Sequence, residues 1–84
     1  MRAFADRVRG VVQRIPTGKT MTYAEVARKA GNAKAARAVG AVMRSNYEKD
    51  IPCHRVVRSD GSLGSYNRGG EQKKRMMLKK EGAL

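Results

Sequence analysis

The sequence contains no Trp, only three Tyr and one Phe, a single Cys and a single His. With so few aromatic residues, the core of the fold must consist mainly of Val, Ile, Leu, Met and Ala side chains. One Cys excludes an intramolecular disulfide, which fits a reducing compartment, so we expect a cytoplasmic protein. One Cys and one His cannot complete the four-ligand shell of structural zinc without several carboxylates, and we therefore expect no metal site.

Long apolar runs and acidic residues are also scarce. No stretch approaches the ~20 apolar residues that a membrane span requires, and the charged N-terminal segment lacks the apolar run of a signal peptide. Seven acidic residues stand against nineteen Lys and Arg, which gives a formal net charge of +12. Such an excess favours polyanionic partners, and nucleic acid is the expected one. At 84 residues we expect one domain, residues 1–84.

Both ends of the chain carry helical patterns. Apolar residues recur at steps of three and four near the N-terminus: Phe4, Val8, Val11, Val12 and Ile15. This spacing predicts an amphipathic helix over about 2–14, ended by the turn residues 16–19. Residues 71–81 are expected to form a very basic helix that ends at Gly82.

Two short helices are predicted between these ends. Thr22 and Glu25 match a capping box, which begins a helix over about 23–30, and Gly31 is placed to end it. Asn32 is the expected cap of a third helix over about 33–44.

Two short helices joined by a tight turn that contains Gly suggest a helix-turn-helix. Its second helix carries Lys34, Arg37 and Arg44, as expected of an element that meets DNA. On this pattern alone, an ordinary helical hairpin with a solvated basic face remains equally open.

A small β-hairpin is predicted after a loop over residues 45–52. Val56-Val57 and Leu63 flank Ser59-Asp60-Gly61-Ser62, in which Asp-Gly tolerates the positive φ of a tight turn. A hairpin behind a helix-turn-helix forms a wing, and Ser65 to Gly70 follow as a Gly-rich loop. The expected fold is therefore mostly α with a small β-hairpin, a single domain resembling a winged helix-turn-helix.

The segment from Ile51 to Val57 holds the only Cys and the only His side by side. Thiolate is the reactive form of cysteine, and an imidazole can accept the thiol proton directly or through a water molecule. The neighbouring Arg55 is a cation that favours the anion. The alternative is that Cys53 is a small buried hydrophobe, and adjacent side chains in a strand face opposite sides.

Residues 52–56, Pro-Cys-His-Arg-Val, resemble the active-site motif of the O6-alkylguanine-DNA alkyltransferases. The resemblance covers nearly the whole chain in order. Residues 22–27 resemble the first helix of that family's helix-turn-helix, and residues 30–40 its turn and recognition helix. The remaining matches are Asn46 as a structural asparagine, Gly64 to Gly70 with Tyr66 as the loop beside the alkyl pocket, and Glu81-Gly82 as the end of the last helix.

The resemblance implies double-stranded DNA as partner, with the alkylated guanine rotated out of the duplex. The recognition helix then lies in the minor groove, and Arg37 fills the vacated space. Tyr23 crowds the phosphate beside the target and donates to the departing guanine. The further residues expected to bind DNA are Thr22, Lys34, Ala36 and Arg44.

The implied reaction is a single-turnover transfer of the alkyl group to Cys53, without cofactor, by a monomer. A relay runs from Cys53 through water to His54, which Glu81 orients, and Asn46 belongs to the same catalytic set. The residues expected to line the substrate pocket are Met43, Val56, Tyr66 and Asn67. For Val56 the expected contact is its backbone carbonyl, which accepts from the guanine amino group.

Three departures from the family pattern stand out. We expect the N-terminal domain of most members to be absent. The segment from Asn46 to Cys53 is one residue shorter than usual, with Tyr47 in place of Pro. The loop before the last helix is one residue longer, with Asn67 in place of Ser.

Two other functions remain open. Alkyltransferase-like proteins bind alkylated guanine without transfer, but they replace the reactive Cys, which this chain keeps. A small basic architectural or RNA-binding protein explains the charge equally well, but it gives no reason for the set of Tyr23, Arg37, Asn46, Cys53-His54 and Glu81.

Overall fold

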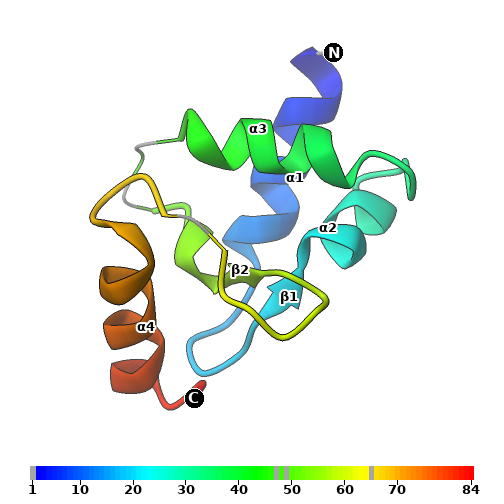
Figure 1. Cartoon of the computed structure of the whole chain (residues 1–84). Helices are drawn as coiled ribbons and strands as arrows, with labels where there is room; N and C mark the ends of the chain where they lie inside the picture. Colours follow the sequence, from blue (N-terminus) through cyan, green and yellow to red (C-terminus); the bar gives the residue numbers. More distant parts are fainter. Residues whose placement is uncertain (1, 47, 49, 65) are drawn as a thin grey trace.

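The computed structural model describes residues 2–46, 48, 50–64 and 66–84, so the departure at Tyr47 and the start of the Gly-rich loop at Ser65 lie outside the described residues. The elements in chain order are α1 (Arg2–Gln13), β1 (Met21–Thr22), α2 (Tyr23–Lys29), α3 (Ala36–Arg44), the 3₁₀ turn η1 (Cys53–Arg55), β2 (Val56–Val57) and α4 (Gly70–Glu81). Helices α1 to α3 pack together, and α4 lies on the other side of the two short strands (Figure 1).

The predicted N-terminal helix is confirmed as α1, and its apolar stripe forms one side of the core. Val8 and Val12 are fully buried, and Phe4 and Ile15 are nearly so. Burying each such side chain contributes roughly 1.5–3 kcal/mol relative to leaving it in water. The same cluster includes Val26, Ala27, Ala30, Val39, Met43, Ile51, Cys53, Val56 and Tyr66. The core therefore extends from α1 to the segment that carries Cys53.

The capping box at the start of α2 is confirmed. The Glu25 amide donates to the Thr22 hydroxyl at 3.1 Å, and the Thr22 amide donates to the Glu25 carboxylate at 2.9 Å. Gly31 ends the helix as predicted, with φ of 101°. The amides of Gly31 and Asn32 donate back to the carbonyls of Arg28 and Ala27, which is the paired closure of a Schellman motif.

The predicted start of α3 is wrong by three residues. The Asn32 side chain does not cap the helix: its oxygen accepts from the Lys34 amide at 3.2 Å, which closes a local turn. The helix begins only at Ala36, with no side-chain cap. Lys34 consequently lies in the turn and not on the recognition helix.

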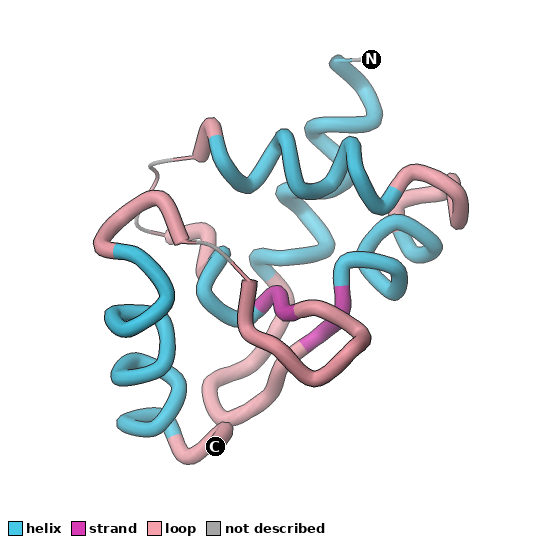
Figure 2. The backbone as a smooth tube through the Cα atoms, in the orientation of Figure 1, coloured by secondary structure: helices cyan, strands magenta, loops and turns pink. Residues whose placement is uncertain are grey.

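The predicted β-hairpin is also wrong. Val56-Val57 pairs in parallel with β1, with Met21 opposite Val56 and Thr22 opposite Val57 (Figure 2). The turn at residues 58–62 does form, since the Arg58 amide donates to the Ser62 carbonyl, but the structure describes no strand at Leu63. The two strands join the start of α2 directly to the end of η1, and so bring Tyr23 and Cys53 into one region. No described helix has the length and apolar character needed to cross a membrane.

Candidate active site beside the helix-turn-helix

A cavity of about 460 Å³ lies between the helix-turn-helix, which α2 and α3 form, and the segment around η1 that carries Cys53. Its wall contains Tyr23 from α2, five residues of α3 and four from the later part of the chain. The lining residues are Tyr23, Ala36, Arg37, Gly40, Met43, Arg44, Cys53, Arg58, Tyr66 and Asn67. Of the predicted pocket residues, Met43, Tyr66 and Asn67 therefore lie in the wall. Val56 does not: its side chain is fully buried in the core, and only its backbone carbonyl remains a predicted substrate contact.

The Cys53 and His54 side chains point in different directions because both residues lie in the 3₁₀ turn η1. The Arg55 amide donates to the Pro52 carbonyl at 2.9 Å, which closes the turn. With about three residues per turn, successive side chains diverge by roughly 120° and not by the 180° of a strand. Cys53 consequently faces the cavity while the adjacent His54 reaches α4. Both residues are buried, with exposed fractions of 5% and 6%.

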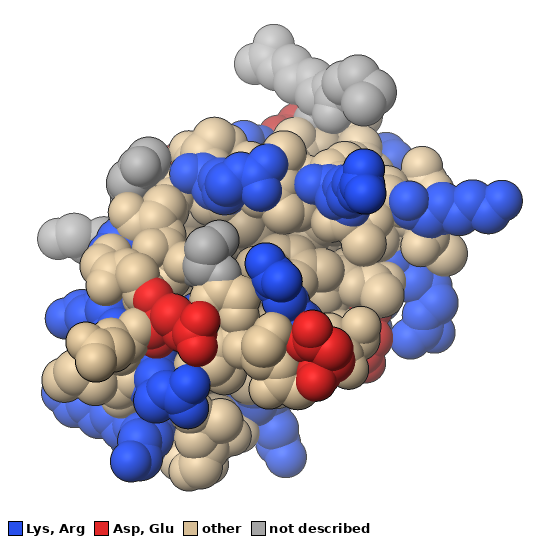
Figure 3. Space-filling view, viewed as in Figure 1, with Lys and Arg blue, Asp and Glu red and all other residues tan. Residues whose placement is uncertain are grey.

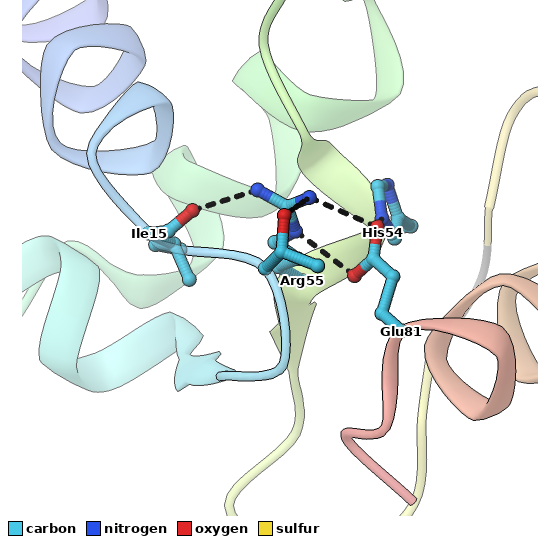
Figure 4. Close-up of polar contacts among 5 residues, drawn as sticks. Ile15, His54, Arg55 and Glu81 are labelled. Carbon is cyan, nitrogen blue, oxygen red and sulfur yellow. Dashed lines mark hydrogen bonds and ion pairs between the residues drawn. The ribbon is translucent and has the colours of Figure 1, made fainter.

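Glu81 at the end of α4 holds both His54 and Arg55 (Figure 4). Its carboxylate lies 2.8 Å from Nε2 of His54 and accepts from Nε and Nη2 of Arg55 at 3.0 and 2.9 Å. Arg55 also donates to the Ile15 carbonyl at 2.7 Å and to the Thr17 hydroxyl at 3.0 Å. This cluster links the segment after α1 to η1 and α4, and it fixes the orientation of the imidazole ring.

The predicted role of Arg55 as counter-charge to the sulfur is not supported by this geometry, because its guanidinium is directed to Glu81, Ile15 and Thr17. The guanidinium within reach of the sulfur is that of Arg68, whose Nη2 lies 4.0 Å from Cys53 Sγ.

The hydrogen bonds from Arg55, and then those from His54, lower the pKa of Glu81 from 4.5 to about 2. A carboxyl group with a depressed folded-state pKa stabilises the fold above its unfolded-state pKa, and this contribution is lost as pH falls. We expect the stability difference between the parent and Glu81→Gln to be full above about pH 5 and to shrink between pH 4.5 and 2. Urea unfolding of both proteins across this range measures it, and a pH-independent difference would contradict the assignment.

Tyr23 lines the same cavity as Cys53. Burial raises the pKa of its hydroxyl, and the nearby Cys53 adds to the rise while Arg58 opposes it. Lys74 of α4 lies behind this ring, with Nζ 5.8 Å from the ring centroid. Lys74 is fully buried, and burial lowers its pKa to about 8. The phenol is therefore neutral at physiological pH and available as a hydrogen-bond donor.

Asn67 closes the cavity against the end of α3. Its amide donates to the carbonyls of Met43, Arg44 and Asn46 at 3.2, 2.7 and 2.8 Å. Asn46 is buried, and its side-chain oxygen accepts from the Glu48 amide at 3.4 Å. Asn46 thus lies between α3 and the segment that carries Cys53, and its predicted structural role stays a prediction.

The exposed rim of the cavity is cationic. Arg37 and Arg44 are exposed on α3, and Arg58 is exposed at the turn after β2. Figure 3 shows Lys and Arg side chains in a row across the part of this face that α3 occupies. Of the other predicted DNA-binding residues, Ala36 lies in the cavity wall, whereas Thr22 and Lys34 lie outside it.

Sequence reasoning missed four residues of the site: Gly40, Arg58, Arg68 and Lys74. Lys74 had a usable signal, because it shares a helical face with Leu78 and Glu81 at steps of four and three. Gly40, Arg58 and Arg68 carry no such local pattern.

The fold and the site together define a helix-turn-helix protein with a buried cysteine in a cavity beside its recognition helix. The chain belongs to the 6-O-methylguanine DNA methyltransferases: the model of that family's DNA binding domain matches residues 3–83.

Curated relatives support this membership. The chain is 56% identical over 66 residues to a methylated-DNA–protein-cysteine methyltransferase of Mus musculus, covering 77% of this chain and 31% of the relative. It is 49% identical over 74 residues to the protein of the same name from Methanothermobacter thermautotrophicus, covering 88% and 42%. The chain thus spans less than half the length of these relatives.

Solved structures show the same fold. The Mycobacterium tuberculosis OGT in complex with DNA matches with a TM-score of 0.87 and 40% identity, covering 93% of this chain and 48% of that one. The S. pombe Atl1 in complex with damaged DNA containing O6-carboxymethylguanine matches with a TM-score of 0.88 and 37% identity, covering 98% and 78%.

Proposed function

We propose that this protein repairs double-stranded DNA by transferring the alkyl group of O6-alkylguanine to Cys53. The observation that carries this proposal is the position of the sulfur. Cys53 is buried, yet it borders a cavity of about 460 Å³ whose wall also includes five residues of α3, the predicted recognition helix. A duplex bound to α3 therefore has a place beside it for one extruded base. Taking the base out of the stack is what chemistry on a duplex generally requires.

The cationic rim supplies the DNA contacts. Arg37, Arg44 and Arg58 border the cavity entrance, so their charges act on the phosphates around the extruded nucleotide. The Arg37 guanidinium is planar and rich in donors, which suits it to occupy the space that the base leaves. Thr22 and Lys34, outside the cavity, contact the neighbouring backbone.

The reaction is a displacement at the alkyl carbon. With Nε2–H of His54 donating to Glu81, the other ring nitrogen accepts the thiol proton through a water molecule. The Cys53 sulfur then forms a bond to the carbon, and the bond to guanine O6 breaks. The electron pair moves to O6, where the Tyr23 hydroxyl donates a hydrogen bond and offsets the developing charge. The guanine anion takes up one proton, and the His54 imidazolium releases the one that it took from the thiol, so the products are neutral guanine and a thioether.

This chemistry requires no cofactor and consumes the protein. A thioether has no facile reverse reaction, so each molecule transfers one alkyl group. We propose a monomer, because one chain supplies the cavity wall, the nucleophile and the base. The expectation of a cytoplasmic location stays a prediction.

The experiment is a titration of the protein against a duplex that contains one O6-methylguanine. Chromatography of the hydrolysed DNA measures how much guanine is restored. We expect restoration to rise linearly and to stop at one guanine per protein molecule. Restoration beyond one equivalent, or none at all, contradicts stoichiometric transfer.

A second candidate is recognition of the lesion without transfer. The match to the S. pombe Atl1 structure, solved with damaged DNA containing O6-carboxymethylguanine, favours it, with a TM-score of 0.88 and 37% identity. In that case the protein retains the lesion-containing duplex, and the titration restores no guanine. An architectural nucleic-acid-binding protein is excluded if the protein binds the lesion-containing duplex more tightly than an undamaged duplex of the same sequence.

The Arg37→Ala variant tests the base-extrusion step. We expect the fluorescence rise of 2-aminopurine beside the lesion to fall roughly tenfold, because unstacking costs a few kcal/mol that the guanidinium helps to offset. Lys73→Ala, which removes one exposed charge from α4, is the matched control and should change only salt-dependent affinity. Equal losses in the two variants would show that Arg37 is a simple phosphate contact.

A further inference from the structure

Arg68 lies in the loop between Tyr66 and α4, and its guanidinium reaches the nucleophile. Its Nη2 lies 4.0 Å from the Cys53 sulfur, and the same nitrogen donates to the main-chain carbonyl of Glu48. The backbone bond anchors the guanidinium to the segment before η1. The hydrogen bond to Glu48 therefore holds the guanidinium in place beside the sulfur.

The charge of Arg68 is not neutralised by a carboxylate among the described residues. Arg55, by contrast, forms an ion pair with Glu81. The Nε of Arg68 is buried and has no hydrogen-bond partner within the part of the chain that the structure describes. A cationic group that has one buried donor without a partner is destabilised unless an anion lies nearby. The Tyr66 phenol also lies within reach of its charge, but burial raises the pKa of that phenol, which leaves the Cys53 thiol as the group whose anion the guanidinium can stabilise.

The Arg68 guanidinium approaches the sulfur without lining the cavity. Cys53, Tyr66 and Asn67 belong to the cavity wall, whereas Arg68 is not among the described residues that line it. The guanidinium therefore contacts the sulfur away from the side on which an alkyl group enters. This is the arrangement that a counter-charge for the nucleophile requires.

We propose that Arg68 is a further catalytic residue, whose guanidinium stabilises the Cys53 thiolate through direct contact with the sulfur. The relevance of this contact to DNA repair rests on the proposed alkyl transfer, but its effect on the thiolate does not. The thiol proton leaves through the His54 path, and the guanidinium keeps its own protons throughout.

Other ionisable groups also face the sulfur. Lys74 of α4, Tyr23 of α2 and Tyr66 of the loop all interact with Cys53 electrostatically, and His54 adjoins it on η1. Burial lowers the pKa of Lys74 to about 8, so its charge declines in the range in which thiols titrate. An arginine stays protonated throughout that range. Arg37, Arg44 and Arg58 also carry persistent charges at the cavity rim, but Arg68 is the described guanidinium recorded within 4.0 Å of the sulfur, and its charge persists from neutral to alkaline pH.

Stabilising a thiolate has two opposite effects on its reactivity. It raises the ionised fraction at neutral pH, and it lowers the nucleophilicity of the anion, with a Brønsted slope of about 0.4–0.5. Removing the guanidinium should therefore slow the reaction at neutral pH and speed it at high pH. A merely structural role for Arg68 does not produce such a crossing of two pH profiles.

The first experiment measures alkylation of Cys53 by iodoacetamide between pH 5 and 10 without DNA, in which the sulfur displaces iodide. For Arg68→Met we expect the midpoint of the profile of alkylation rate against pH to move up by about one pH unit. Its rate should be about threefold below the parent at pH 7 and about threefold above it at the alkaline plateau. Arg68→Lys should lie between the two. Arg75→Met, which removes an exposed charge of α4, should superimpose on the parent.

The second experiment repeats the comparison with a duplex that contains O6-methylguanine, and thermal unfolding checks that each variant is folded. If the pH profiles of the parent and Arg68→Met cross in both reactions, the proposal is supported. Crossing with iodoacetamide but no transfer by any variant would refute the proposed function and leave the role of Arg68 intact. Superimposable profiles of the parent and a folded Arg68→Met would overturn the role of Arg68, whatever the transfer rate.

Discussion

Replacing Cys53 with Ser is expected to abolish alkyl transfer and to leave lesion binding intact. A serine hydroxyl at neutral pH is almost wholly protonated, and the imidazole that suffices for a thiol cannot maintain an alkoxide at useful concentration. We expect the rate of guanine restoration to fall by roughly a thousandfold or more. Single-turnover kinetics with a duplex containing O6-methylguanine measure this rate.

Binding of the same duplex separates chemistry from folding in this experiment. Cys53 is part of the core cluster, and Ser is close to it in size, so the cavity and the rim formed by Arg37, Arg44 and Arg58 should persist. The affinity of Cys53→Ser for the lesion-containing duplex should match that of the parent. Transfer by Cys53→Ser at the parent rate would show that another group is the nucleophile.

Replacing Glu81 with Ala should destabilise the fold and slow transfer together. The change removes the acceptor for Arg55 and His54, whose side chains are only 15% and 8% exposed. Breaking a largely buried ion pair while leaving the cation behind costs roughly 3 kcal/mol in the free energy of unfolding. The imidazole also loses the partner that fixes its orientation and tautomer. Urea unfolding and single-turnover kinetics measure the two effects.

Glu71 provides the matched control on the same helix. It also pairs with an arginine, Arg75, but both side chains are more than half exposed. Exposed pairs contribute about 0–1 kcal/mol, so Glu71→Ala should change neither stability nor transfer appreciably. Equal destabilisation by the two substitutions would mean that the Glu81 cluster adds nothing beyond a surface ion pair.

Much of the helical framework follows from local sequence signals. The apolar steps of α1, the capping box of Thr22 and Glu25, and Gly31 as a helix end act within a few residues, and the structure confirms each of them. The start of α3 was missed because the Asn32 side chain has two local uses. It could cap a helix or close a turn, and the turn prevails.

Long-range pairing explains the larger errors. The strand Val56-Val57 joins residues 35 positions earlier in the chain, at Met21-Thr22, and nothing in an isolated turn at Asp60-Gly61 reveals that partner. The sequence alone does not determine how the side chains of the adjacent Cys53 and His54 are directed relative to each other. The 3₁₀ turn resolves it by sending the sulfur to the cavity and the imidazole to Glu81.

The electrostatics of the site depend even more on tertiary structure. Arg55 was the obvious counter-charge for Cys53 because it lies two positions away, but Glu81 and Ile15 engage it. Arg68 reaches the sulfur only because the loop folds back over the Glu48 carbonyl. In a chain with nineteen Lys and Arg, the sequence does not distinguish a cation that contacts the nucleophile from those on the surface.

The alkyl group is expected to end on the Cys53 sulfur. Mass spectrometry of the intact protein, followed by peptide mapping, tests this after incubation with one equivalent of a duplex carrying O6-methylguanine. We expect a gain of one methylene on the peptide that contains Cys53, with none after incubation with undamaged DNA. An unchanged mass in protein that has bound the lesion, or a methyl group on any other residue, would contradict it.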